Sequence, residues 1–239
     1  MRSILITGAS SGIGAATAKL FLAEGWRVGL MARREDALRE VAGGQANAVV
    51  LPGDVTDPKS VEAAFDAFCQ GGPIDVLFNN AGVFMPAAPI DRTRVRDWNE
   101  ALAVNLTGMF LAARAAFGRM RAQGGGRIVN NGSISAHVPR EGAVTYTVTK
   151  HAITGLTKQL ALDGRSLGIA CGQIDIGNAR TPMLEALDAA QRADGGRGVS
   201  MMDVEDAARA VLHMASLPPE ANVLTMTIMA NAMPYVGRG

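Results

Sequence analysis

A tyrosine and a lysine four positions apart are the residues of this chain best suited to moving a proton. Tyr146 and Lys150 occur in a segment with helical spacing, so their side chains share one face of the helix. A tyrosine has an unperturbed pKa of about 10, and an ammonium group beside it favours the phenolate. Such a phenol can donate a proton to a carbonyl oxygen or accept one from an alcohol, and the hydroxyl of Ser133 could hold that oxygen. Taken alone, the Tyr-x-x-x-Lys spacing also fits an ordinary amphipathic helix.

A glycine-rich segment near the N-terminus could bind a dinucleotide. Residues 7–14, Thr-Gly-Ala-Ser-Ser-Gly-Ile-Gly, follow an apolar run and precede a helical pattern. Glycines let the backbone approach a pyrophosphate, and a helix N-terminus offers unpaired N–H groups and a positive dipole end. The spacing differs from the usual Gly-x-Gly-x-x-Gly fingerprint and from a P-loop, and an ordinary glycine turn is the alternative. The candidate cofactor-binding residues here are Gly8, Ser10, Ser11, Gly12, Ile13 and Gly14.

Together these two segments predict a hydride-transfer enzyme, because no side chain supplies a hydride and a nucleotide cofactor does. The three histidines and two cysteines lack metal-ligand spacing, so we expect no metal site.

Composition limits the classes of protein to which the chain can belong. It has 239 residues, 48% of them hydrophobic, which suits one α/β domain over residues 1–239. A net charge of +1 gives no basic field for nucleic acid, and no run reaches the roughly 18 apolar residues of a membrane span. The first apolar run begins at residue 3 and reads as a strand, so we expect no signal peptide. We therefore expect a cytoplasmic protein without nucleic-acid or membrane partners.

Strand and helix patterns alternate along the chain and must position these groups. The expected strands are at 3–6, 28–31, 48–51, 75–78, 127–130, 169–174 and 223–229. The expected helices are at 13–23, 35–41, 57–70, 98–120, 144–162 and 203–214. This alternation predicts a Rossmann-type, doubly wound parallel sheet of about seven strands with helices on both faces. Ligands of such sheets bind beyond the carboxyl ends of the strands.

Residues 184–200 interrupt this alternation, because residues 194–198 have no apolar periodicity. We interpret a segment around 183–202 as a flap over the substrate, and an ordinary surface loop is the alternative.

With these motifs in place, the chain resembles the short-chain dehydrogenase/reductase family over nearly its whole length. The glycine segment 7–14 matches the cofactor loop of that family, and residues 79–82 match its Asn-Asn-Ala-Gly signature. Asp54 and Val55 match the pair that meets the adenine ring. The matched cofactor residues after the third and fourth strands are Asp54, Val55, Asn80, Ala81 and Gly82.

The resemblance also implies a catalytic set. Tyr146 would be the general acid/base, and Ser133, thirteen residues before it, would orient the substrate oxygen. Lys150 would bind the nicotinamide ribose and lower the pKa of the tyrosine. Asn105 would help hold a water linked to the lysine.

The end of the second strand bears on cofactor choice. Relatives that prefer NAD place an aspartate there, whereas this chain has Ala32 followed by Arg33 and Arg34. Arginine suits a 2′-phosphate through charge and bidentate geometry, and Ser10 could add a hydroxyl. We therefore predict NADP, with NAD possible. Solvated arginines at a helix start are the alternative.

The chain departs from the family pattern at three places. Ile176 replaces a usual proline after the sixth strand, while Gly177 and Thr181 remain as expected cofactor contacts, Thr181 toward the nicotinamide amide. Gly132 occupies a position where many relatives carry another serine. The C-terminal segment 226–239 lacks the Asp-Gly-Gly ending common in acyl-carrier-protein reductases, which weakens a role in fatty-acid synthesis.

These features predict an NADP-dependent oxidoreductase that acts on a small ketone or secondary alcohol. The alternatives are a catalytically idle NAD(P)-binding regulatory protein and a 3-oxoacyl-thioester reductase; an epimerase or dehydratase fits less well because such relatives are longer.

The expected substrate contacts are Phe84, Met85, His137, Val138, Met183, Leu187, Met201 and Met202, with Arg140 or Arg180 as a clamp if the substrate carries a carboxylate. Family resemblance also implies a homo-oligomer, tetramer or dimer, through the alanine-rich helices around Leu111 and Leu156, which could instead only pack on their own sheet.

Overall fold

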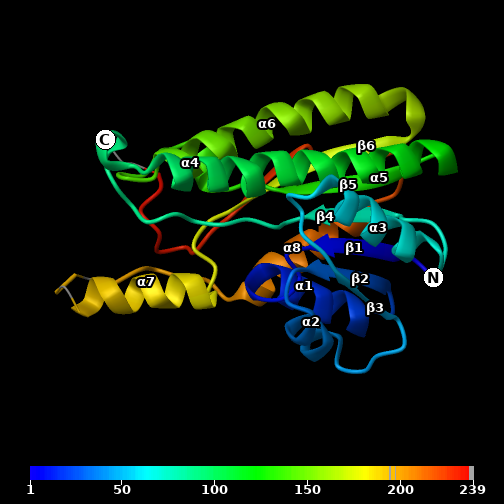
Figure 1. Ribbon diagram of the computed structural model, residues 1–239, viewed down its shortest axis with the longest axis horizontal. Coiled ribbons are helices and arrows are strands. Elements are labelled where there is room, and N and C mark those ends of the chain that lie inside the picture. Colours follow the sequence, from blue (N-terminus) through cyan, green and yellow to red (C-terminus); the bar gives the residue numbers. More distant parts are fainter. Residues whose placement is uncertain (194, 197, 237–239) are drawn as a thin grey trace.

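In the computed structural model, which describes residues 1–193, 195–196 and 198–236, seven parallel strands form one sheet in the order β3-β2-β1-β4-β5-β6-β7 (Figure 1). The strands are β1 Ser3–Thr7, β2 Arg27–Ala32, β3 Ala48–Pro52, β4 Val76–Asn79, β5 Gly126–Asn131, β6 Ile169–Ile176 and β7 Thr225–Ile228. Each expected strand is present, with ends that differ by a few residues. This is the doubly wound Rossmann-type sheet that the sequence predicts.

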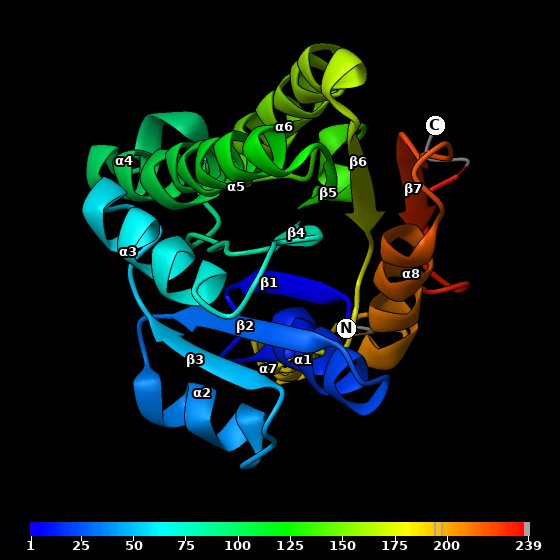
Figure 2. The same cartoon turned by 90° about the vertical axis from the view of Figure 1, so that its right-hand side faces the viewer.

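Helices cover both faces of the sheet (Figure 2). The α-helices are α1 Gly12–Ala23, α2 Glu35–Ala42, α3 Pro58–Cys69, α4 Val95–Leu102, α5 Met109–Gln123, α6 Val144–Gly164, α7 Pro182–Ala193 and α8 Val204–Ser216. A π-helical turn, η2, lies at Ala103–Gly108. The short 3-10 turns are η1 Ile90–Arg92, η3 Ile134–Ala136 and η4 Arg165–Leu167. Helices α1, α2 and α8 pack on one face, and α3, α5 and α6 on the other.

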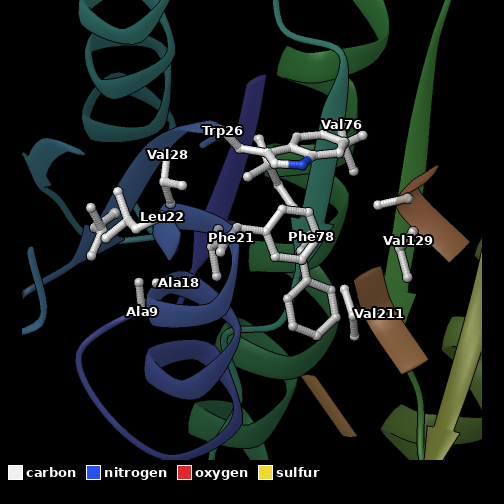
Figure 3. Packing of buried hydrophobic residues seen from close by; sticks show 14 of the residues in the cluster. Ala9, Ala18, Phe21, Leu22, Trp26, Val28, Val76, Phe78, Val129 and Val211 are labelled. Atoms are coloured by element: carbon white, nitrogen blue, oxygen red, sulfur yellow. The ribbon is translucent and has the colours of Figure 1, made fainter. Parts of the chain in front are cut away.

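Two layers of apolar side chains pack the helices against the sheet. Successive residues of a strand point alternately into one layer and the other. Ile4 and Ile6 point into the layer beneath α1 and α8, whereas Leu5 points into the layer beneath α3 and α5. Figure 3 shows the first layer, where Phe21 of α1 and Phe78 of β4 meet across it. Strands that bury both faces carry nearly continuous apolar runs, which is why the sequence shows these strands so clearly.

The order in which strands are added to the sheet reverses at β1: β2 and β3 lie on one side of it, and β4 and the later strands lie on the other. β1 and β4 are therefore neighbours in the sheet, although β2 and β3 lie between them in the sequence. Loops that leave the carboxyl ends of neighbouring strands at such a point diverge and leave a crevice. The glycine-rich segment 8–11 leaves β1 here, and residues 80–89 leave β4 beside it.

The long helical segment expected at residues 98–120 is observed, but it is not regular. α4 and α5 are joined by the π-helical turn η2, which contains Asn105. A π-helical turn inserts one residue per turn and shifts the side-chain register, and such turns often occur at functional sites. The spacing of apolar residues in the sequence does not reveal this π-helical turn, because the helical turns before and after it still place apolar residues on one face.

The expectation of an irregular segment over 184–200 is wrong in its first part, where the structure contains α7. Alanine and leucine are strong helix formers, and Pro182 suits a first turn. The glycines of residues 195–198 end the pattern, and residues 194 and 197 lie outside the described residues. α7 extends away from the sheet at the lower left of Figure 1.

Among the described residues, one helical stretch, residues 95–123, is long and apolar enough to cross a membrane by length and composition. In its apolar window, 56% is buried inside the fold, between the sheet and neighbouring helices. It is a core helix.

Candidate active site

A cavity of about 990 Å³ lies at the carboxyl ends of the strands. The loops after β1, β2, β3, β4, β5 and β6 all contribute to it. The predicted site residues that line it are Gly8, Ser10, Ser11, Gly12, Ile13, Gly14, Arg33, Arg34, Asp54, Val55, Asn80, Ala81, Gly82, Ser133, Tyr146, Lys150, Gly177 and Thr181. Asn105 does not line the cavity and lies behind its wall.

The loops after β1 and β4 are joined tightly at the bottom of the cavity. The Thr7 hydroxyl accepts hydrogen bonds from the backbone N–H groups of Asn80 (2.8 Å) and Ala81 (3.0 Å). The Asn80 amide donates to the Thr7 carbonyl at 2.9 Å. Gly14, in the first turn of α1, packs so closely on this junction that a Cβ there would lie 2.3 Å from the Gly8 carbonyl oxygen. The glycine at this position is therefore needed for helix α1 to approach the loop.

Lys150 is held rigidly beneath Tyr146 on α6. Its side chain is buried at 3% exposure, and its Nζ donates to the carbonyl oxygen of Asn131 at 2.7 Å. Nζ also lies 5.4 Å from the centre of the Tyr146 ring. The backbone of Asn131, at the end of β5, therefore fixes the ammonium beside the phenol, and Asn131 is a site residue that the sequence analysis does not identify.

Ser133 lies two residues beyond β5 and is the N-cap residue of the 3-10 turn η3. Its hydroxyl accepts from the backbone N–H of Ser135 at 3.1 Å, and its own N–H donates to Asp175 at 2.9 Å. Both contacts are made by a residue that is only 4% exposed. Ser133, Tyr146 and Lys150 all line the cavity, and α6, which carries two of them, packs against η3, the turn that Ser133 precedes.

Asn105 connects the π-helical turn to the loop after β4. Its Oδ1 accepts from Val83 N at 2.7 Å, and its Nδ2 donates to Val83 O at 2.9 Å. A weaker contact joins Nδ2 to the Thr149 hydroxyl of α6 at 3.4 Å. The side chain is fully buried. In this structure Asn105 braces the loop that follows Gly82 and joins it to α6.

Arg33 and Arg34 lie at the outer end of the cavity, where both side chains are exposed. Arg34 reaches across to the glycine loop, with 3.5 Å between its Nη2 and the Ser10 hydroxyl. Asp54 lies at the same end, and its Oδ1 accepts from the N–H and the hydroxyl of Thr56. Two guanidinium groups therefore border this end of the cavity.

The isoleucine that replaces the family proline is accommodated without a break in the sheet. Strand β6 continues through Ile176, which pairs in register with Ile228 of β7 and lines the cavity. Gly177 N donates to Ile228 O at 2.8 Å. Thr181 follows and faces Gly12, whose Cβ would lie 3.1 Å from the Thr181 methyl group.

Ala179 and Met202 pair with each other on either side of the segment that contains α7. A parallel bridge pairs these two residues, with 2.9 Å hydrogen bonds on either side of it. Within the segment, Asp188 of α7 accepts from Val199 N at 2.6 Å and from Arg192 Nε at 2.8 Å. The hydrogen bond from Arg192 lowers the pKa of Asp188.

Three of the eight expected substrate contacts line the cavity, namely Phe84, Met183 and Leu187. The expectation is wrong for Met85, His137, Val138, Met201 and Met202, none of which lines it. Met202 instead packs against the layer beneath α1, and His137 turns toward Asp175, with 2.8 Å between Nε2 and Oδ2. Arg140 lines the cavity and donates to Asn178, whereas Arg180 contacts Glu185.

These contacts describe a cavity for an elongated ligand with a phosphate-rich middle and a reactive end. In the order of the strands, the two guanidinium groups follow β2, the glycine loop follows β1 in the middle, and Ser133 follows β5 on the other side. Among the described residues, no three His, Cys, Asp or Glu side chains are grouped to hold a metal ion. The arrangement fits a dinucleotide and proton transfer to an oxygen beside it.

The sequence profile of the short chain dehydrogenase family matches residues 2–192. This chain belongs to that family. As a short-chain dehydrogenase/reductase, it is an oxidoreductase that acts on alcohol and carbonyl groups with a nicotinamide cofactor, NAD or NADP.

Known proteins are similar in sequence or structure to this chain over most of its length. It is 38% identical over 192 residues, 77% of each chain, to 2-(R)-hydroxypropyl-CoM dehydrogenase of Xanthobacter autotrophicus. It is 36% identical to cis-4-hydroxycyclohexanecarboxylate dehydrogenase of Sinomonas cyclohexanicum, over 80% of this chain and 79% of that one. A crystal structure of 3-ketoacyl-(acyl-carrier-protein) reductase from Brucella melitensis, complexed with NADH, superposes with a TM-score of 0.87 at 25% identity, covering 96% of this chain and 97% of that one.

Proposed function

We propose that this short-chain dehydrogenase/reductase uses NADP to interconvert a small ketone and the corresponding secondary alcohol. The observation that carries the proposal is the wall formed by Ser133, Tyr146 and Lys150, with the lysine fixed by the Asn131 carbonyl. This wall combines a proton donor, an oxygen-binding hydroxyl and a buried positive charge in one cavity.

Each of these groups has a distinct role in the proposal. Tyr146 passes the proton of its hydroxyl to the substrate oxygen during reduction and takes it back during oxidation. The Ser133 hydroxyl donates to the same oxygen and holds it against the phenol. The Lys150 ammonium stabilises negative charge on the phenol oxygen as the proton leaves. The bound nicotinamide supplies or accepts the hydride.

The remaining polar groups of the wall would bind the cofactor and a water molecule that passes protons. Lys150 would donate to the nicotinamide ribose, and Thr181 to the carboxamide. Within the described residues, the buried Oδ1 of Asn131 has no hydrogen-bond donor, and a ribose hydroxyl could provide one. Asn105, behind the wall, would hold a water linked to Lys150.

The outer end of the cavity supports NADP over NAD. Arg33 and Arg34 border the place where the adenine ribose would lie, with Asp54 and Val55 beside it. A 2′-phosphate would accept hydrogen bonds from these guanidinium groups and from the Ser10 hydroxyl near Arg34. NAD remains a usable cofactor because its pyrophosphate would meet the same glycine loop.

The reactive end of the cavity supports an apolar substrate. Phe84 lies against Tyr146, with 5.0 Å between the ring centres, and Met183 and Leu187 of α7 line the same end. Residues 183–202 would act as the flap that covers the substrate, with the bridge between Ala179 and Met202 as its base.

The direct test is turnover of a panel of ketones and secondary alcohols with NADPH and NADH, using wild type and Tyr146→Phe. Loss of the phenol proton should lower kcat about 10²–10⁴-fold, while NADPH still binds with a similar affinity. Tyr235→Phe is the matched control, because Tyr235 is the other tyrosine and does not line the cavity. Undiminished turnover by Tyr146→Phe would refute the assignment of this residue. NADPH binding without turnover on any compound would favour an idle, regulatory protein.

A second candidate substrate is one with an acidic group. Arg140 lines the cavity near the reactive end, and the relative from Sinomonas cyclohexanicum acts, by its name, on a hydroxycarboxylate. Hydroxy acids therefore belong in the panel, as do 3-oxoacyl thioesters, because of the reductase from Brucella melitensis. A kcat/KM at least tenfold higher for either class than for neutral ketones would replace the first proposal.

The same proposal includes a homo-oligomer in the cytoplasm. α5 and α6 lie side by side on the outer surface of the sheet and carry the exposed apolar residues Phe110 and Leu162. A tetramer or dimer could bury these residues, and light scattering of the purified protein measures the oligomer directly.

A further inference from the structure

A buried carboxylate stands directly behind Ser133. Asp175, on β6, is fully buried, and its Oδ1 accepts from Ser133 N at 2.9 Å and from Gln173 Nε2 at 2.7 Å. Its Oδ2 lies 2.8 Å from His137 Nε2. Three nitrogen atoms, Ser133 N, Gln173 Nε2 and His137 Nε2, therefore surround the two oxygens of this buried side chain.

The same carboxylate explains why residue 132 is glycine. A Cβ added at Gly132 would lie 2.1 Å from Asp175 Oδ1 and 2.7 Å from Gln173 Nε2. Contacts below 3.0 Å require a shift of the surrounding atoms. Asp175 occupies the space that a side chain at position 132 would need, and each of the two residues limits what the other can be.

The hydrogen bond from Ser133 N to Asp175 holds the part of the backbone that sets the direction of the Ser133 side chain. The chain leaves β5 at Asn131 and turns at Gly132, whose N–H donates to Ile174 O at 2.8 Å. The next N–H, that of Ser133, is held by Asp175. Ser133 then lines the cavity, and its hydroxyl accepts from Ser135 N. Without the carboxylate, the Ser133 N–H would lose its partner and the turn could relax.

We infer that Asp175 is a positioning residue for the reaction: it fixes the Ser133 backbone so that the hydroxyl meets the substrate oxygen, and Gly132 is its required partner. The inference rests on the proposed function for the role of Ser133 in that reaction. Displacement of a group that binds the reacting oxygen by about 1 Å can cost about 100-fold in rate. His137 is the outer support, because it holds the second oxygen of the carboxylate.

Kinetics of Asp175 variants in two backgrounds test the positioning role. Asp175→Ala should lower kcat about 10–100-fold, with the Kd for NADPH unchanged. Asp175→Asn should recover part of that loss, because an amide oxygen still accepts from Ser133 N. In a Ser133→Ala background, Asp175→Ala should lower kcat less than about threefold, because a misplaced serine no longer matters. An equal fall in both backgrounds, or no fall in the wild-type background, would overturn the positioning role.

Thermal stability tests the pairing with Gly132 without any activity. Gly132→Ala should lower the Tm by about 2–12 °C in wild type, and by less than half as much in Asp175→Ala. Gly118→Ala in α5 is the matched control, because nothing lies within 4 Å of its added Cβ, and it should behave alike in both backgrounds. If Gly132→Ala does not fold, a folded Gly132→Ala/Asp175→Ala protein is the supporting result. Equal losses of Tm, or failure of both proteins to fold, would overturn the pairing. Wild type without turnover on any substrate would count against the proposed function alone, since the Tm comparison would still decide the pairing.

Discussion

The proposed preference for NADP depends on two exposed arginines, and replacement of Arg34 tests it most directly. Arg34 lines the outer end of the cavity and is the N-cap residue of α2. Its contact with the Ser10 hydroxyl is 3.5 Å long, so little is lost when the guanidinium turns to a phosphate. Arg34→Gln keeps a polar side chain and removes the charge.

The magnitude follows from the chemistry of the 2′-phosphate, which carries about −1.5 to −2 charge at pH 7. A hydrogen bond to a charged group contributes about 1.5–3 kcal/mol. Both arginines are exposed, and screening by water reduces this to about 1–2 kcal/mol. One arginine is therefore expected to change the Kd for NADPH about 5–30-fold. NADH has a neutral hydroxyl at that position, so its Kd should change less than about twofold.

The assay is a fluorescence titration of NADPH and NADH with wild type, Arg33→Gln and Arg34→Gln. Arg39→Gln is the matched control, because Arg39 is on the same helix, pairs with Glu35 and does not line the cavity. NADPH affinity should also fall with added salt in wild type, and fall less steeply in the two variants. An equal loss of NADPH and NADH affinity in Arg34→Gln, or no loss of either, would refute the reasoning and remove Arg34 from the phosphate site.

Two further predictions concern the chemistry of individual side chains. Burial raises the pKa of the Cys171 thiol to about 12, and it also raises the pKa of the half-buried Cys69. In Cys69→Ser protein, Cys171 should therefore react with Ellman's reagent at pH 8 only after denaturant is added, and rapid labelling of the native protein would contradict its burial. The Arg94 guanidinium donates to Asp97 at 2.7 Å and lowers the pKa of that carboxyl from 3.8. Because the folded pKa is the lower one, this stabilisation is complete above the unfolded value and is lost as the pH falls through the folded value. The Tm difference between wild type and Arg94→Gln should thus be constant from about pH 8 to 5 and shrink as the pH falls below about 4; a difference that grew in acid would have the wrong sign.

Much of the fold could be predicted because its signals are local. A strand buried on both faces needs an uninterrupted apolar run, as in residues 3–6, and a helix that packs on a sheet repeats its apolar residues every three to four positions. Such patterns locate the elements and, by their alternation, the class of sheet. Residues 184–200 show where this fails. α7 has an amphipathic pattern like the other helices, but the glycine-rich residues 195–198 that follow it dominated the interpretation of the whole segment, and its helix is missed.

The substrate end of the site shows a second kind of failure. Nearness in sequence to Ser133 and to residues 184–200 suggested His137 and Met202 as substrate contacts, yet His137 turns to Asp175 and the partly buried Met202 packs against the core. Which way a loop side chain points depends on partners that are distant in sequence. In the case of His137 that partner is 38 positions away.

By itself, the sequence determined the family, the strand–glycine loop–helix unit and the pair Tyr146 and Lys150, because each depends on residues within a few positions of one another. Only the tertiary structure decided that Lys150 is fixed by the carbonyl of Asn131, and that Asp175 fills the space beside Gly132. These contacts join residues from different strands and helices. The parallel sheet brings them to one edge, and nothing in the local pattern of either partner records the other.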